Sequence, residues 1–216
     1  HMTPVLVLSE GFLANSSEPW RIPVSSELEP IRVRHPDDPD GFQPYSREAD
    51  TLARPWVIPG TPGMEHRLGG LEKHPGTGAV SYAPEDHAAM CALRRDKVAC
   101  VAGFIPELEV TGPAEGSLLV LSWGGTRGAA ITAVERLQRQ GHAVAHAQLR
   151  YLNPFPRNLG EVLRRYRTVM IPELNHGQLA MLIRAHFLVD VVSHARVQGR
   201  PFTVDEIETR AGELLA

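Results

Sequence analysis

The second half of the chain predicts an α/β fold built on a doubly wound, mostly parallel sheet. Short apolar runs alternate there with segments of helical periodicity, several times between residues 117 and 216. Because neighbouring parallel strands are joined by crossover connections that are normally helical, this alternation is typical of such a sheet. The prolines provide the second observation: fourteen of the eighteen lie between Pro4 and Pro113, so the first half is expected to be extended and irregular.

The elements of the expected α/β domain, residues 117–216, follow from the spacing of apolar residues. Thr203, followed by two acidic residues, has the pattern of a helix N-cap. The expected order is strand 117–122, helix 126–140, strand 144–149, helix 158–166, strand 168–171, helix 178–188, strand 189–192 and helix 205–215.

Three segments precede this domain. Residues 3–8 form a short β-branched apolar run, which predicts a buried strand. Residues 17–80 contain too many prolines for long regular elements and predict an extended wrapping connection with a glycine-rich loop. Its apolar residues, such as Trp20, are too many for a solvated linker and indicate that the segment lies along another surface. Residues 81–116 predict a helix that begins at Pro84, followed by a linker.

Charge and cysteine content exclude several classes of protein. With 22 basic and 25 acidic residues, the chain has no overall positive field to hold nucleic acid or an anionic membrane, and no apolar run approaches the roughly 20 residues of a membrane span. The basic group Arg94, Arg95 and Lys97 is expected on a solvated helix face or paired with acids. Cys91 and Cys100 lie nine residues apart on different faces of the same helix, which favours reduced thiols and a cytoplasmic protein.

The glycine-rich loop over residues 59–74 is the most unusual stretch of the chain. Glycine and proline give it an irregular backbone that presents Glu65, His66, Arg67 and Lys73 close together, as a loop facing an anionic substrate would. The alternative is a surface loop whose charges pair with one another.

A metal site is a further alternative for this loop. His66 and His74 with Glu65 or Glu72 would be the ligands, but the spacing matches no zinc signature and no cysteine joins them. We therefore expect no metal here.

Polar residues also follow two expected strands at the carboxyl edge of the sheet. They are Arg150 and Asn153 after one strand, and Glu173, Asn175 and Gln178 after another. This edge is the usual ligand or partner surface of an open parallel sheet, so the five side chains are expected to converge there. The alternative is that Asn175 caps the next helix and the prolines after Asn153 shape a turn.

The turn at residues 123–126 is a weaker candidate for binding an anion. It lies where a strand becomes a helix, but it matches neither the dinucleotide fingerprint nor the P-loop. A tight connection is the favoured interpretation. The chain also lacks the nucleophile elbow, so nothing in the sequence indicates a catalytic triad.

Several segments, taken in their order along the chain, resemble the alpha subunit of 2-oxoglutarate:ferredoxin oxidoreductase, in the 2-oxoacid:acceptor oxidoreductase family. Two positions depart from the family pattern: residues 9–12 read Ser-Glu-Gly-Phe where Ser-Asp-Gly-Tyr is usual, and His176 stands where leucine is usual. The segments that carry the resemblance are residues 8–15, 18–20, 59–73, 149–156, 172–175 and 177–179.

The resemblance implies a longer subunit, of which this chain is the carboxyl-terminal portion. Residues 1–2 are then a cloning scar, residues 3–16 the remnant of an upstream pyrimidine-binding domain, and residues 117–216 a domain similar to the carboxyl-terminal domain of transketolase. The glycine-rich loop is then expected to face substrate or coenzyme A.

The resemblance further implies thiamine diphosphate-dependent oxidative decarboxylation of a 2-oxoacid, here 2-oxoglutarate, to an acyl-CoA with reduction of ferredoxin. The full complex would contain thiamine diphosphate, magnesium and an iron–sulfur cluster, none of them bound by this chain alone, together with a beta subunit in an assembly of two alpha and two beta subunits. Ferredoxin and coenzyme A would meet the chain only through that complex. The isolated chain is expected to be inactive and to hold no catalytic residue. The alternative is a non-catalytic α/β module for interaction or for binding a small ligand.

Overall fold

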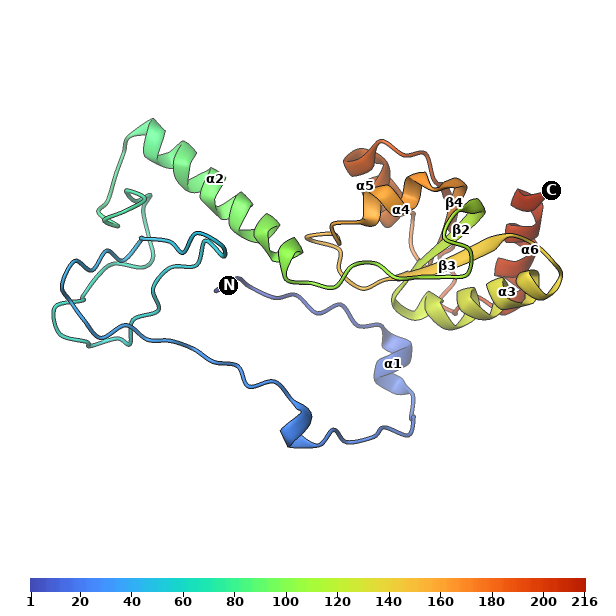
Figure 1. Cartoon of the computed structure of the whole chain (residues 1–216), viewed down its shortest axis with the longest axis horizontal. Coiled ribbons are helices and arrows are strands. Elements are labelled where there is room, and N and C mark those ends of the chain that lie inside the picture. Colours follow the sequence, from blue (N-terminus) through green and yellow to red (C-terminus); the bar gives the residue numbers. More distant parts are fainter. The chain divides into compact units, whose positions relative to one another are not determined.

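The computed structural model describes residues 1–216, and the chain forms two compact units (Figure 1). The first unit consists of His1–Leu6 and Glu18–Phe104, and the second of Val7–Ser17 and Ile105–Ala216. None of the helices combines the length and hydropathy that a bilayer-spanning helix requires.

The second unit is built on a five-stranded sheet in the order β1-β3-β2-β4-β5. β2, β3, β4 and β5 are parallel, whereas the two-residue edge strand β1 runs antiparallel to β3. The connection from β2 leads to β3 on one side of it, and the connection from β3 crosses back over β2 to β4 on the other side. The strand order therefore reverses between β2 and β4. The strands are β1 Val110–Thr111, β2 Gly116–Trp123, β3 Val144–Leu149, β4 Tyr166–Glu173 and β5 Val192–Ala195.

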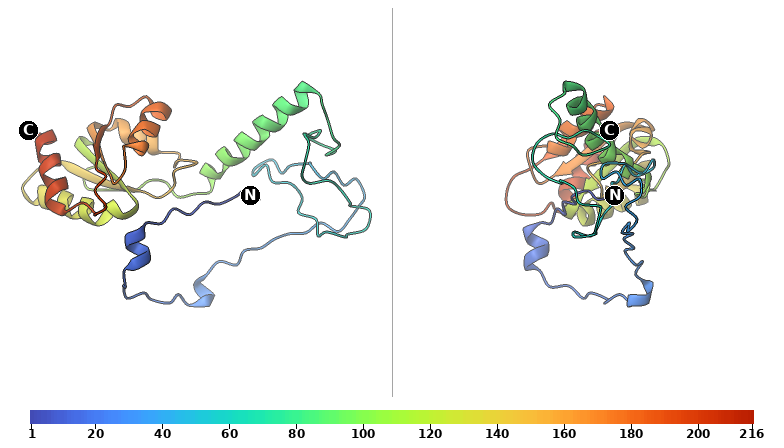
Figure 2. Two further views of the ribbon diagram at one scale, coloured as in Figure 1. Left: turned by 180° about the vertical axis from the view of Figure 1, so that it is seen from behind. Right: turned by 90° about the vertical axis from the view of Figure 1, so that its left-hand side faces the viewer.

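Helices cover both faces of this sheet, which confirms the doubly wound, mostly parallel architecture. α3 and α6 lie side by side on one face, and α4 and α5 cover the other (Figure 1). The view from behind shows the same pairing of α3 with α6 (Figure 2). The helices of this unit are α1 Gly11–Asn15, η3 Gly124–Thr126, α3 Arg127–Arg139, α4 Leu159–Arg164, α5 Gln178–Phe187 and α6 Val204–Leu215.

Alternating side chains of the central strands supply the two halves of the core. Leu119 and Leu121 of β2 face α4 and α5, whereas Leu118 and Val120 face α3 and α6, and all four are fully buried. Such runs, apolar on both faces, are expected of strands that are covered on both sides. Thr203 caps α6 as expected. Its hydroxyl accepts a hydrogen bond from the backbone amide of Glu206, and the Glu206 carboxylate accepts one from the backbone amide of Thr203.

The first unit has few regular elements besides one long helix. α2 covers Pro84–Cys100 and continues into the 3-10 turn η2 at Val101–Gly103, and a second 3-10 turn, η1, covers Ser25–Glu27. Turns and a bridge between Lys73 and Val80 shape the rest.

Tyr45 anchors these turns. Its ring is 5% exposed, and its hydroxyl donates to the Leu68 carbonyl at 3.0 Å. A Cβ at position 78 would lie 2.6 Å from this ring, and φ there is +71°, so both contact and conformation require Gly78. Met64 and Met90 complete the small apolar core of the unit, at 2% and 4% exposure.

The expected strand at residues 3–8 does not form. The segment has no strand assignment, and Leu6, at 91% exposure, is representative of its side chains. A strand needs a neighbour to pair its backbone groups, and the described chain offers none there. Trp20 is also 82% exposed, so the surface that this part of the chain was expected to lie along is not provided by its own residues.

Candidate functional site

The first unit contains a hollow of about 350 Å³ with strongly basic walls. Five basic side chains and one acidic side chain line it, a local balance of +4 in a chain whose net charge is −3. A concave surface of one sign concentrates its electric field and attracts oppositely charged ligands. The lining residues are Tyr45, Arg47, Arg54, Leu68, Gly69, Gly70, Leu71, Glu72, Lys73, Met90, Arg94 and Lys97.

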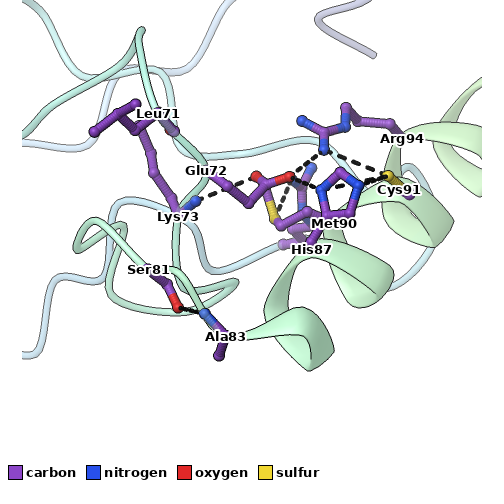
Figure 3. A network of polar contacts seen from close by, with 10 residues as sticks. Leu71, Glu72, Lys73, Ser81, Ala83, His87, Met90, Cys91 and Arg94 are labelled. Carbon is purple, nitrogen blue, oxygen red and sulfur yellow. Dashed lines mark hydrogen bonds and ion pairs between the residues drawn. The ribbon is translucent and has the colours of Figure 1, made fainter.

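Glu72 is the single carboxylate of the basic hollow, and its charge is already shared. Its Oε2 accepts hydrogen bonds from His87 Nδ1 and Arg94 Nη2, both at 2.8 Å (Figure 3). The bond from His87, followed by that from Arg94, lowers the pKa of Glu72 to about 2. Glu72 is therefore ionised near neutral pH, but it neutralises Arg94 and leaves the other cations of the hollow unpaired.

A metal could in principle use part of this network. Glu72, His87 and Cys91 place one ligand atom each within 4.8 Å of one another, a donor set that zinc accepts. The guanidinium of Arg94, however, contacts both the Glu72 carboxylate and the Cys91 sulfur, the latter at 3.9 Å (Figure 3). A fixed cation between two of the three ligands opposes a second cation, so we assign the group to an ion-pair network. His66 and His74 are the two histidines that the sequence offered as metal ligands. The Nδ1 atom of each is hydrogen-bonded to backbone groups.

Four basic side chains of the hollow have no acidic partner, and Lys73 is one of them. Arg47 donates to the Leu52 carbonyl at 3.0 Å, Arg54 to the Pro44 carbonyl at 3.3 Å, and Lys97 to the Met2 carbonyl at 2.8 Å. The Arg54 guanidinium also lies over the Tyr45 ring, 4.8 Å from its centroid. Backbone carbonyls orient these side chains without cancelling their charge.

The glycine-rich loop contributes to the hollow through its second half. Lys73 lies in the lining, is 5% exposed, and donates from Nζ to the Leu71 carbonyl at 2.7 Å. Glu65, His66 and Arg67 are not among the lining residues. His66 Nδ1 donates to the Met64 carbonyl at 2.7 Å, and neither Glu65 nor Arg67 forms an ion pair. The charges of this loop therefore do not pair with one another, contrary to the surface-loop alternative.

At the carboxyl edge of the sheet, Glu173 is not on the surface. It is fully buried, and its carboxylate accepts the amides of Leu179 at 2.8 Å and Ala180 at 3.0 Å, in the first turn of α5. Asn175 accepts the amides of Gly177 and Gln178, so it caps the helix as the alternative interpretation predicted. The helix N-terminus, a common anion site in α/β folds, is thus satisfied by the chain itself.

The other polar residues at this edge do not join these two. Arg150 and Asn153 are exposed and follow β3, which is separated from β4 by β2, a distance of about 10 Å between strands. No hydrogen bond links them with Glu173, Asn175 or the exposed Gln178. The expected convergence of five side chains is therefore not what the structure shows.

The turn after β2 is closed by its own partners too. Gln148 donates to the Gly124 carbonyl at 3.4 Å, and Thr126 exchanges hydrogen bonds with the Trp123 backbone. A Cβ at position 125 would lie 1.9 Å from Glu10 Oε1, so a carboxylate of this chain already lies against the turn. This favours a tight connection over a site for an external anion.

Ser122 and His146 are the one buried hydroxyl–imidazole pair of the second unit, 2.7 Å apart. The Ser122 hydroxyl donates to Gln148 Oε1 at 2.5 Å, so His146 Nε2 is the donor to Ser122. This is the reverse of the direction in which a base would activate the hydroxyl. Burial, with a smaller contribution from Arg127, lowers the pKa of His146 to about 4.

Comparison with known proteins assigns the chain to a family. Residues 116–207 match the family model of the pyruvate:ferredoxin oxidoreductase core domain II. Over 206 residues, 95% of this chain, the sequence is 52% identical to the 2-oxoglutarate oxidoreductase subunit KorA of Mycobacterium tuberculosis, covering 31% of that protein. The chain belongs to the 2-oxoacid:ferredoxin oxidoreductase family and corresponds to part of its alpha subunit.

Other family members match over the same fraction of their length. The alpha subunit of 2-oxoacid:ferredoxin oxidoreductase 2 from Aeropyrum pernix is 30% identical over 95% of this chain and 33% of its own length. The solved 2-oxoglutarate:ferredoxin oxidoreductase of Magnetococcus marinus, with 2-oxoglutarate, coenzyme A and succinyl-CoA bound, superposes with a TM-score of 0.83 at 29% identity, over 90% of this chain and 34% of that chain. The chain thus spans about one third of the length of these relatives of the oxidoreductase family.

Sequence analysis missed three of the unpaired cations of the hollow. Arg47 and Arg54 lie in the proline-rich segment and belong to no motif, and Lys97 was expected on a solvated helix face or paired with acids. The sequence offers no signal for them, because acidic residues such as Glu48, Asp50 and Asp96 alternate with these basic residues.

Proposed function

We propose that the chain is part of the alpha subunit of a thiamine diphosphate-dependent 2-oxoglutarate:ferredoxin oxidoreductase. The observation that carries this proposal is the 52% identity with a 2-oxoglutarate oxidoreductase subunit across 95% of the chain. In the proposed reaction, 2-oxoglutarate and coenzyme A give succinyl-CoA and carbon dioxide, and two electrons pass to ferredoxin. A beta subunit is the proposed partner, in an assembly of two alpha and two beta subunits in the cytoplasm.

The residues of this chain do not fit the redox and thiamine cofactors. A ligand set of four thiolates is out of reach, because the chain has two cysteines, both on α2. The buried carboxylate Glu173 is committed to backbone amides, and no Gly-Asp-Gly segment occurs to hold a diphosphate and magnesium. We therefore propose that other parts of the enzyme hold these groups and that the isolated chain is inactive.

The role proposed for this chain is electrostatic. 2-Oxoglutarate carries two carboxylates and coenzyme A carries phosphates, so both are attracted by basic side chains held on irregular backbone. Arg67 is exposed and unpaired, and His66 has one ring nitrogen fixed by a backbone carbonyl, which leaves Nε2 to meet a ligand. We propose that Arg67 and His66 contact substrate or coenzyme A in the complete enzyme, with Glu65 beside them and Lys73 in the adjoining hollow.

Substitution in the complete complex tests this role. Arg67→Ala and His66→Ala should each lower kcat/KM for 2-oxoglutarate or coenzyme A roughly ten- to a hundredfold, the effect of losing one charge-assisted contact. Arg139→Ala is the matched control, because Arg139 pairs only with Glu135 on α3 and should leave both values unchanged. Unchanged kcat/KM for both substrates in both loop variants would contradict the proposed role.

The assignment of the reaction itself needs a separate measurement. The complete complex is assayed for ferredoxin reduction with 2-oxoglutarate, pyruvate and branched 2-oxoacids in turn. Turnover fastest with 2-oxoglutarate supports the proposal, and a preference for another 2-oxoacid would replace the substrate while retaining the family.

A further inference from the structure

The unpaired cations of the basic hollow indicate that an anion is missing from it. Arg47, Arg54 and Lys97 line this space and have only neutral acceptors, namely backbone carbonyls and, for Arg47, the Met90 sulfur at 4.0 Å. Like charges at close range repel one another, and their assembly is destabilising unless a counter-charge is present. Glu72 does not serve, because it is bound to His87 and Arg94.

A second observation concerns one atom of Arg47. Its Nε is buried and has no hydrogen-bond partner, although the same guanidinium is held by the Leu52 carbonyl through Nη1. A buried donor without an acceptor costs free energy, and native structures seldom leave one without a reason. Burial and the neighbouring charge of Arg54 both lower the pKa of Arg47, as expected where cations are crowded without a counter-ion.

We propose that the basic hollow binds a phosphate group carried by a coenzyme of the coenzyme A type. The planar fork of an arginine can donate two parallel hydrogen bonds to two oxygens of a phosphate, and a lysine adds a point charge. The hollow of about 350 Å³ lies at the lower end of the range for small-molecule sites, so it admits the phosphate with part of its carrier. The choice of coenzyme rests on the proposed function, whereas the phosphate itself rests on the charges.

Phosphate is favoured over carboxylate by the number of cations. A carboxylate offers one negative charge to the unpaired cations, whereas a phosphate monoester offers up to two charges and three acceptor oxygens. The donors Arg47, Arg54 and Lys97 come from two segments, the two arginines from the turns after Tyr45 and the lysine from α2. The oxygens of a tetrahedral phosphate point in several directions, whereas the two oxygens of a carboxylate lie in one plane.

Binding to the chain of 216 residues tests the proposal without any enzyme assay. Pyrophosphate, coenzyme A, dephospho-coenzyme A and 2-oxoglutarate are titrated separately by calorimetry. We expect saturable binding of pyrophosphate and coenzyme A, with 2-oxoglutarate at least about tenfold weaker. Affinity should fall sharply toward about 1 M salt, where the Debye length is about 3 Å.

Variants assign the binding to the hollow. Arg47→Gln and Lys97→Gln should each weaken pyrophosphate and coenzyme A binding roughly ten- to a hundredfold. Arg95→Gln is the matched control, because Arg95 lies on the same helix, is outside the lining and pairs with Asp96. Glu72→Gln, which removes the single negative charge, should strengthen binding, and this gain cannot arise from misfolding.

The outcomes separate the claims. Coenzyme A binding that Arg47→Gln weakens supports the full proposal, and loss of affinity in dephospho-coenzyme A places the 3′-phosphate in the hollow. Pyrophosphate binding without coenzyme A binding supports the phosphate site but rejects the coenzyme. Absence of saturable binding by every phosphate, or tighter binding of 2-oxoglutarate than of coenzyme A, overturns the proposal and leaves the proposed enzyme reaction untouched.

Discussion

Replacing Glu173 should destabilise the second unit by a predictable amount. This side chain is fully buried, and its two oxygens accept the amides of Leu179 and Ala180 at 2.8 and 3.0 Å. Each buried amide that loses its acceptor costs about 1–3 kcal/mol. In Glu173→Gln the amide oxygen keeps one of the two bonds while the NH2 group faces the second donor, so we expect a loss of about 2 kcal/mol. Glu173→Ala leaves both amide donors without an acceptor and also leaves a cavity, so we expect the free energy of unfolding to fall by about 4 kcal/mol.

Urea unfolding followed by circular dichroism at the helical wavelengths measures this loss, because most of the helices belong to the second unit. Hydrogen exchange gives the site-specific readout: the amides of Leu179 and Ala180 should exchange faster in both variants, whereas amides of α6 should not. Glu213→Gln is the control, since this exposed carboxylate pairs only with Arg210. If both Glu173 variants lie within about 0.5 kcal/mol of the parent chain, the capping role is refuted, because that is the range of ordinary surface substitutions.

Two further predictions concern the second unit. Burial lowers the pKa of His146 to about 4, so between pH 6.5 and 4 the unfolded chain binds a proton that the folded chain does not. The free energy of unfolding should therefore fall by about 3 kcal/mol as pH drops through this window. In His146→Gln the midpoint of urea unfolding should depend less on pH over the same window. At position 177 φ is +86° and a Cβ would lie 2.8 Å from Ser193 Oγ, so Gly177→Ala should cost about 1–2 kcal/mol. Gly212→Ala, within α6 and with open space around it, should instead stabilise by about 0.5–1 kcal/mol, so equal melting temperatures for the two glycine variants would contradict this reasoning.

The sheet and its helices could be predicted because their signals are local. β3 and α6 begin and end within a residue of the expected positions, and the cap at Thr203 is read directly from three neighbouring residues. The last strand was expected at residues 189–192, but β5 covers Val192–Ala195. The expectation followed the apolar run, whereas the residues that pair in the strand are more polar. Val191, at 1% exposure, is buried in the connection to the strand, which shows that burial and strand pairing need not coincide.

The strand expected at residues 3–8 fails for a different reason. A β-branched apolar run favours extended backbone, but pairing depends on a neighbour that local sequence does not specify. The carboxyl edge shows a similar limit. The residues were correctly placed after the strands, yet whether Glu173 faces solvent or turns inward to cap α5 depends on packing over several residues.

The basic hollow could not be predicted from the sequence because it combines side chains of turns with side chains of α2. Arg47 and Arg54 are brought together by hydrogen bonds such as the one from Leu52 to Glu48, and these follow no repeating pattern. The glycine-rich loop was the part of the hollow that the sequence indicated. Lys73 of this loop was expected beside an anionic ligand, and it lies in the lining of the hollow.

Three charges of this hollow, those of Glu72, Arg47 and Arg94, are fixed over the neutral range of pH. The bonds from His87 and Arg94 hold the pKa of Glu72 near 2, so its carboxylate remains ionised. Arginine side chains do not lose their proton in proteins, so Arg47 and Arg94 stay charged although burial lowers the pKa of Arg47. A ligand that binds here therefore meets three charges that do not switch with pH near neutrality, whereas burial lowers the pKa of Lys97 below its usual range. A phosphate monoester, whose second ionisation lies near pH 6, adds a pH dependence of its own to the affinity.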